Sequence, residues 1–246
     1  MRQDTGKVFR IEDYRPTEYF IPQTRLLFVL SPQETIVTAE LEIERRDGTA
    51  PGTPLELDGD ELECLGVEIN GVAAADGSYE ATVDKLTLHN PPQDKSFRLK
   101  VVTKLNPSRN SELMGLYVSK GVYCTQCEPE GFRRITYFID RPDMLSVYTV
   151  RIEGDQTAAP LLLSNGNMVE SGQLDGGRHF AVWHDPFPKP SYLFALVAGD
   201  LAGLKDEFIT ASGRKVALGI YVEHGKESRA AYAMDALKRS MKWDEE

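Results

Sequence analysis

The chain has 246 residues, a formal net charge of -10 and a pI near 5.0. This length suits one large domain, or one domain and part of another. The acidic balance argues against nucleic acid and anionic membranes as partners, because both need clustered lysine and arginine. Residues 1–15 contain no apolar segment of a secretory signal, and no apolar run is long enough to cross a bilayer. Three cysteines do not make a disulfide framework, so we expect a reducing, cytoplasmic location.

Residues 35–46 alternate apolar and polar side chains with a period of two, which predicts a half-buried strand of an antiparallel sheet. The apolar positions are Val37, Ala39, Leu41 and Ile43. Residues 19–30 precede this strand, and the connecting turn contains Pro32, whose ring fixes φ. The two segments therefore predict a β-hairpin.

Later segments carry the same strand and turn signals. Asn70-Gly71 predicts a second hairpin, because this pair supplies the positive φ angles of a type I′ turn. Further strands are predicted at residues 96–103, 145–153, 160–163, 179–184, 192–198 and 215–222. Many short strands with turns between them indicate a mainly β fold, built as a sandwich or a large saddle-shaped sheet.

Residues 228–243 depart from this pattern and predict an amphipathic helix. The apolar positions recur at intervals of three and four: Ala230, Ala233, Ala236, Leu237 and Met241. Because this helix stands alone at the end of a β-rich chain, we expect it to lack the elements against which it should pack.

Residues 116–143, with the sequence LYVSKGVYCTQCEPEGFRRITYFIDRPD, contain the most informative chemistry. Cys124 and Cys127 have the spacing of a metal or redox pair, but a structural zinc needs four ligands and Cys64 is distant in the sequence. A thioredoxin-like pair would stand at a helix start in a βαβ unit, and the surroundings here predict strands. Two small side chains in a tight turn are the favoured interpretation.

The charged and aromatic residues near this segment have two interpretations each. The charged set could line a substrate path or form ion pairs that brace the loop, and the close alternation of signs favours ion pairs. Its members are Arg133, Arg134, Asp140, Arg141 and Asp143. The aromatic set is predicted to lie in the core and not in a specificity pocket, and consists of Tyr137, Phe138, Trp183, Phe187 and Tyr192.

As a string, residues 116–143 resemble the bacterial aminopeptidase N group of zinc metallopeptidases. The resemblance continues, in the same order, through residues 163–167, 185–200 and 240–246. It implies that residues 1–200 are the amino-terminal β domain of such an enzyme. It also implies that residues 201–246 are the first hairpin and helix of a thermolysin-like catalytic domain, which ends here before its zinc site.

The resemblance also implies a site. Gln126 and Glu128 match a glutamine and a glutamate with which the family holds the free α-ammonium group of a peptide substrate. A carboxylate forms a charge-assisted bond with a cation, whereas an internal peptide bond offers only a neutral amide. Peptide substrates, bound through their free amino terminus, and the remaining domains of the same polypeptide are therefore the expected partners.

Zinc is the cofactor that the resemblance implies for the full-length enzyme, and the family holds it with an H-E-x-x-H helix. None of the four histidines here stands four residues from another: His89, His179, His184 and His224. His179 and His184 would lie about 17 Å apart along a strand. We therefore expect this segment to contain no metal ligand and no catalytic residue, and to be inactive alone. The alternative is a free-standing, non-catalytic β-sandwich binding module.

Overall fold

The computed structural model describes residues 10–246, which divide into two compact units between Ala198 and Gly199. The prediction that residues 1–15 lack a secretory signal concerns a segment whose first nine residues lie outside the described part. Within the described part, no helix combines the length and the apolar character that crossing a bilayer would require.

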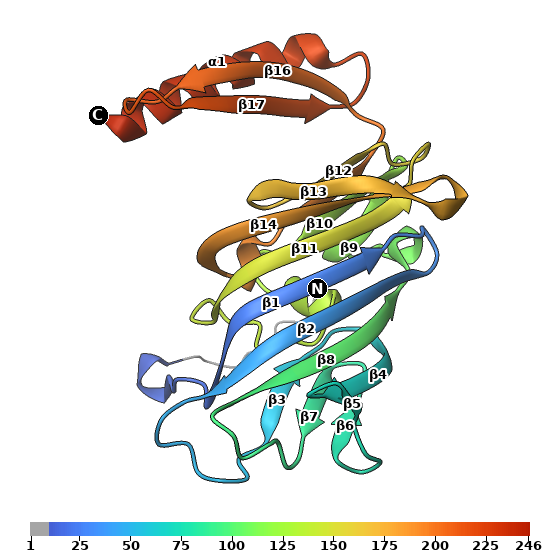
Figure 1. The fold of residues 1–246 in the computed structure, drawn as a ribbon, viewed down its shortest axis with the longest axis vertical. Helices are drawn as coiled ribbons and strands as arrows, with labels where there is room; N and C mark the ends of the chain where they lie inside the picture. Colours follow the sequence, from blue (N-terminus) through green and yellow to red (C-terminus); the bar gives the residue numbers. More distant parts are fainter. Residues whose placement is uncertain (1–9) are drawn as a thin grey trace. The chain divides into compact units, whose positions relative to one another are not determined.

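The first unit is built on an eight-stranded sheet (Figure 1). In spatial order its strands are β13 (Asn167–Leu174), β14 (Arg178–Pro190), β11 (Leu145–Asp155), β1 (Tyr19–Val29), β2 (Thr35–Arg45), β8 (Ser96–Leu105), β4 (Glu63–Ile69) and β5 (Val72–Ala73). β1 pairs with β2 in the antiparallel sense, which confirms the predicted hairpin, and with β11 in the parallel sense. Two segments far apart in the sequence thus meet at the centre of this sheet.

The alternation of apolar residues explains how these strands bury one face. In β2 the four predicted apolar positions from Val37 to Ile43 are fully buried, while the residues between them are partly or fully exposed. The same alternation occurs in β8, where the buried residues are Phe97, Leu99 and Val101. Between β4 and β5, Asn70 and Gly71 have φ values of 52° and 82°, as a type I′ turn requires.

Two smaller sheets complete the core of this unit. One contains β12 (Leu161–Ser164), β15 (Leu196–Gly199), β10 (Val122–Gln126) and β9 (Gly115–Ser119), and the other contains β3 (Leu55–Asp58), β7 (Lys85–Leu88) and β6 (Tyr79–Ala81). One short 3-10 helix, η1 (Ile11–Asp13), precedes β1, and four others lie between strands: η2 (Pro107–Arg109), η3 (Phe132–Arg134), η4 (Asp175–Gly177) and η5 (Ser191–Leu193). Buried side chains from all three sheets form one continuous hydrophobic cluster, so the predicted mainly β fold is confirmed.

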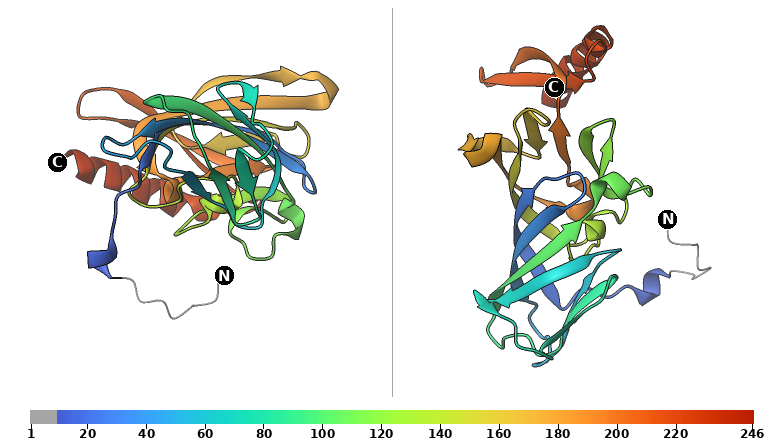
Figure 2. Two further views of the ribbon diagram at one scale, coloured as in Figure 1. Left: turned by 90° about the horizontal axis from the view of Figure 1, so that it is seen from below. Right: turned by 90° about the vertical axis from the view of Figure 1, so that its right-hand side faces the viewer.

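The second unit consists of a hairpin and a helix. Strands β16 (Ala202–Ile209) and β17 (Lys215–Val222) pair in the antiparallel sense, and α1 (Glu227–Glu245) contacts both of them. Figure 2 shows α1 lying along the hairpin. Ala230 and Met234 of the helix are buried in this contact.

Several sequence-based predictions are wrong in detail. Residues 192–198 are not one strand, because Phe194 N–H donates to the Ser191 carbonyl and closes η5 before β15 begins. The helix does have elements to pack against, and Ala233 is exposed while the unpredicted Met234 faces the hairpin. Phe187 is 76% exposed, since it lies among prolines beyond the last residue of β14 that pairs with β13.

Candidate functional site

The predicted site residues lie at the end of β10 and in the turn that follows it. The side chains of Gln126 and Glu128 are both exposed. Gln126 Nε2 donates to the backbone carbonyl of Glu128 at 3.1 Å, so the structure brings the two residues together. Within residues 10–246, no hydrogen bond or ion pair engages the Glu128 carboxylate. The turn therefore offers a carboxylate and an amide oxygen to a donor from outside.

The backbone of this turn is closed on itself. Gly131 N–H donates to the carbonyl of Cys127 at 2.7 Å, and the Cys127 side chain is buried. A Cβ atom at position 131 would lie 2.2 Å from the carbonyl oxygen of Gln126, so only glycine fits there. Glu128 thus lies within a tight loop whose two ends are packed.

An aromatic cluster anchors the residue that follows the turn. Phe132 is fully buried, and its ring packs edge-on against Phe138, with centroids 4.9 Å apart, and against Phe194 at 5.3 Å. Tyr148 completes the cluster. Such contacts add to the energy of burial and fix ring orientation, so the chain leaves the turn in a defined direction.

Arg133 and Asp140 form a buried ion pair beneath the turn. Asp140 Oδ2 accepts from the Arg133 Nε at 3.0 Å and from the Arg133 backbone N–H at 3.1 Å. Ser191 Oγ donates to the other oxygen of Asp140. Burial by itself lowers the pKa of Arg133, but the charges of Asp58 and Asp140 raise it above its ordinary value. Ser191 was not foreseen, because no local pattern links it to a residue so distant in the sequence.

The other two arginines of this segment also form ion pairs, Arg134 with residues outside the segment and Arg141 within it. Arg134 contacts Asp60 at 3.0 Å and Glu61, and Arg141 contacts Asp143 at 2.7 Å. These contacts confirm the interpretation of the charged set as ion pairs that brace the loop.

The cysteines and histidines do not gather into a ligand set. Cys124 and Cys127 are free thiols, and burial raises the pKa of both. His179 Nε2 contacts the Ala159 carbonyl at 2.7 Å, and His184 Nδ1 contacts the Thr149 hydroxyl at 3.0 Å. Among residues 10–246 there is no group of three or more His, Cys, Asp or Glu side chains that could hold a metal ion.

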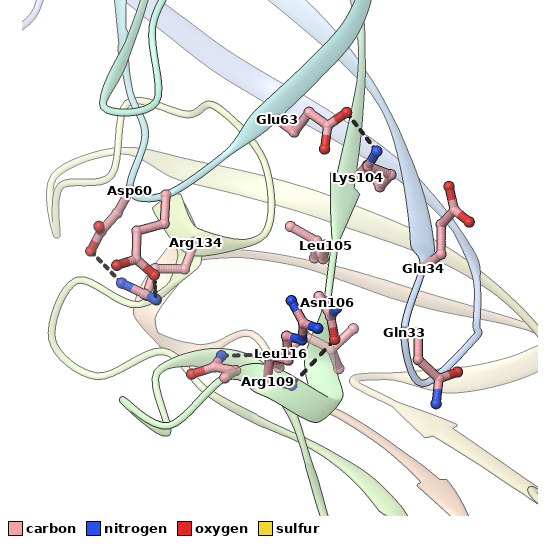
Figure 3. A pocket seen from close by; sticks show the side chains of 12 residues that line it. Gln33, Glu34, Asp60, Glu63, Lys104, Leu105, Asn106, Arg109, Leu116 and Arg134 are labelled. Atoms are coloured by element: carbon pink, nitrogen blue, oxygen red, sulfur yellow. Dashed lines mark hydrogen bonds and ion pairs between the residues drawn. The ribbon is translucent and has the colours of Figure 1, made fainter.

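A cavity of about 520 Å³ lies on the first unit, and neither Gln126 nor Glu128 lines it. Figure 3 shows two ion pairs among the side chains that line this cavity, Lys104 with Glu63 and Arg134 with Asp60. Each of these four charged groups has a partner, whereas the Glu128 carboxylate has none among residues 10–246.

Comparison with known proteins agrees with the resemblance found in the sequence. Residues 29–193 match the model of the Peptidase M1 N-terminal domain. The chain is 56% identical, over its full length, to the Aminopeptidase N of Caulobacter vibrioides, of which it spans 28%. The crystal structure of Legionella pneumophila aminopeptidase A in complex with aspartic acid superposes with a TM-score of 0.90 at 35% identity, and covers 96% of this chain and 28% of that one.

A more distant structure shares the fold alone. The M1 zinc metallopeptidase of Deinococcus radiodurans, bound to a Tyr-Ser-Ala substrate, superposes with a TM-score of 0.69 at 18% identity, over 85% of this chain and 48% of that one. The family match covers most of the chain, and the relative from Caulobacter vibrioides aligns along all of it. The chain therefore belongs to the Peptidase M1 N-terminal domain family.

Proposed function

We propose that this chain is the amino-terminal part of a zinc-dependent aminopeptidase, an enzyme that removes the first residue from peptides. The observation that carries the proposal is the 56% identity, along the whole chain, to the Aminopeptidase N of Caulobacter vibrioides. Since the chain spans 28% of that protein, activity would belong to a longer polypeptide. Residues 201–246 would then be the beginning of its thermolysin-like catalytic domain.

The described residues do not fit a zinc site. The four histidines are dispersed, and no cluster of three or more possible ligands exists among residues 10–246. The metal would therefore be held by other parts of the full-length polypeptide. The proposed contribution of this chain is substrate recognition and scaffolding. Its three free thiols suit a reducing cytoplasm, which is the location we propose.

In this proposal, Gln126 and Glu128 recognise the free α-ammonium group of the substrate. The Glu128 carboxylate accepts a charge-assisted hydrogen bond from the ammonium, and the Gln126 amide oxygen accepts a second hydrogen bond from it. The bond from Gln126 Nε2 to the Glu128 carbonyl supports this role, because it holds the amide oxygen of Gln126 in a defined orientation. An internal peptide segment would leave the carboxylate without a cation.

The exposure of Glu128 sets a condition on this role. An exposed ion pair contributes only about 0 to 1 kcal/mol, because water and salt screen it. Strong recognition requires that substrate and the rest of the polypeptide exclude water from the turn. The isolated chain should therefore bind amines weakly, and the site is best tested in the full-length enzyme.

The test is Glu128→Gln in the full-length enzyme. This change keeps the shape of the side chain and removes its charge. It should lower kcat/KM by an amount equivalent to about 2 to 5 kcal/mol of activation free energy, which is the range for loss of one partner of a buried charge pair. The substrate α-amino group titrates near pH 8, so part of the wild-type activity should decline as the pH rises through about 8, and the variant should lose this dependence.

Two controls accompany this measurement. Gln126→Ala should cost less, about 1 kcal/mol, because it removes a neutral hydrogen bond. On a substrate whose amine is acetylated, the wild-type enzyme and Glu128→Gln should have the same kcat/KM, because this substrate has no ammonium group for Glu128 to bind. A Glu128→Gln enzyme within about twofold of wild type on free-amine substrates would show that the turn has only a structural role.

A further inference from the structure

We infer that Asp140 is a positioning residue for amine recognition, acting on Glu128 through Arg133 and Ser191. This inference rests on the proposed function of Gln126 and Glu128. Asp140 is 2% exposed, so its side chain is buried away from a substrate bound at the exposed turn. What it contacts is Arg133, which comes directly after Phe132 and so lies just beyond the turn.

Asp140 holds Arg133 in place through three hydrogen bonds. Its Oδ2 atom accepts from both the backbone and the side chain of Arg133, at 3.1 and 3.0 Å, and its carbonyl accepts from Arg133 Nη2 at 2.9 Å. Three hydrogen bonds from one residue fix both the backbone and the guanidinium plane. Arg133 Nη1 in turn lies 3.4 Å from the carboxylate of Glu130, which belongs to the turn itself.

Both ends of the turn are attached to the same segment, residues 191–196. Before the turn, Thr125 Oγ1 accepts from Leu196 N–H at 2.8 Å. After the turn, Arg133 is joined to Asp140, which accepts from Ser191 Oγ. Because Gly131 closes the loop on Cys127, the position of Glu128 follows from these two attachments.

The buried pair of Arg133 and Asp140 contributes more to the positioning of its neighbours than to the stability of the fold. The cost of removing two charges from water largely offsets their attraction, so a buried ion pair is weak evidence for stability. Its bonds are directional, however, and displacement of a recognition group by about 1 Å can cost about 100-fold in rate. Locking of a recognition group by neighbouring hydrogen bonds is the usual requirement for a productive site.

The test is a double-mutant cycle in the full-length enzyme, with an aminoacyl anilide as substrate. Asp140→Asn should lower kcat/KM about tenfold or more in the wild-type background, and by less than about twofold in the Glu128→Gln background. Circular dichroism confirms that each variant is folded. Asp143→Asn is the matched control, because it also breaks an arginine pair, with Arg141, but does not contact the turn. It should change kcat/KM by less than about twofold in both backgrounds.

Each other outcome overturns the inference in a recognisable way. Equal losses from Asp140→Asn in both backgrounds would mean that Asp140 supports the fold and not Glu128. If Asp140→Asn does not fold, Ser191→Ala replaces it in the cycle, and equal effects in both backgrounds, or no effect, would overturn the inference. If Glu128→Gln is itself unimpaired, the proposed amine site fails, and the inference fails with it.

Discussion

At the scale of single residues, the turn after β10 combines exposed acceptors with buried neighbours. Gln126 and Glu128 are exposed, while Cys127, Gly131 and Phe132 are buried. Buried flanking residues restrict how far the exposed ones can move, because packing fixes their backbone. The packing of the buried flanking residues therefore fixes the positions of Gln126 and Glu128 relative to each other.

Gly131→Ala tests the close packing of this turn, because it adds a single methyl group to the buried backbone. The added methyl group would meet the Gln126 carbonyl oxygen at 2.2 Å, so the backbone must shift, and we expect about 1 to 3 kcal/mol of destabilisation. Urea unfolding of the 246-residue chain measures it. Gly66→Ala is the control, because nothing lies within 4 Å of its Cβ position and its φ is not positive. Equal stability of the two variants would contradict the close approach at Gly131.

At the scale of elements, the hairpin and helix of residues 199–246 form a small unit with few buried residues. Met234 is 4% exposed, whereas Tyr232 and Trp243 are 75% and 76% exposed. Polar contacts add to the packing: Lys238 of α1 pairs with Asp206 of β16, and the Glu245 carboxylate accepts from Ala211 N–H. Polar contacts at the surface therefore join α1 to the hairpin beside a small apolar contact.

The pair of His224 and Asp200, in the same unit, is sensitive to pH. Its hydrogen bond, 2.9 Å long, and the charge of Asp200 raise the pKa of His224 above its ordinary value of 6.5. Stabilisation from this pair is fully present below that value and is lost as the pH rises through the higher, folded pKa. An NMR titration should show the pKa of His224 falling toward 6.5 in Asp200→Asn. An unchanged pKa in that variant would contradict the pairing.

At the scale of the whole molecule, a continuous core joins three sheets, and the possible metal ligands are dispersed over the described residues. The chain spans 28% of its Caulobacter vibrioides relative. If the turn binds a substrate amine as we propose, the reactive centre would lie in other parts of the full-length polypeptide.

We expect the purified 246-residue chain to hold no stoichiometric zinc and to hydrolyse no aminoacyl anilide, because it lacks the H-E-x-x-H pair. Elemental analysis and an anilide assay measure the two properties on the same preparation. One tightly held zinc per chain, or turnover that depends on zinc, would contradict this expectation.

The sequence by itself determined the features that depend on near neighbours. Alternation identified β2 and β8 and the face that each buries, Asn70-Gly71 identified a turn, and residues 215–222 were placed as the strand that is observed. Family membership also followed from the residues alone, because long matching strings occurred in the right order. The amine-binding role of Gln126 and Glu128 came from that resemblance and stays a prediction.

Only the tertiary structure decided which distant segments meet. A period of two shows which face of a strand is buried but not which strand lies beside it, so the parallel pairing of β1 with β11 was not foreseen. Burial likewise depends on neighbours: Phe187 is exposed and Met234 is buried, although both are apolar. The contact between Ser191 and Asp140 arises because folding brings residues 191–196 beneath the turn, and no local pattern records such a contact.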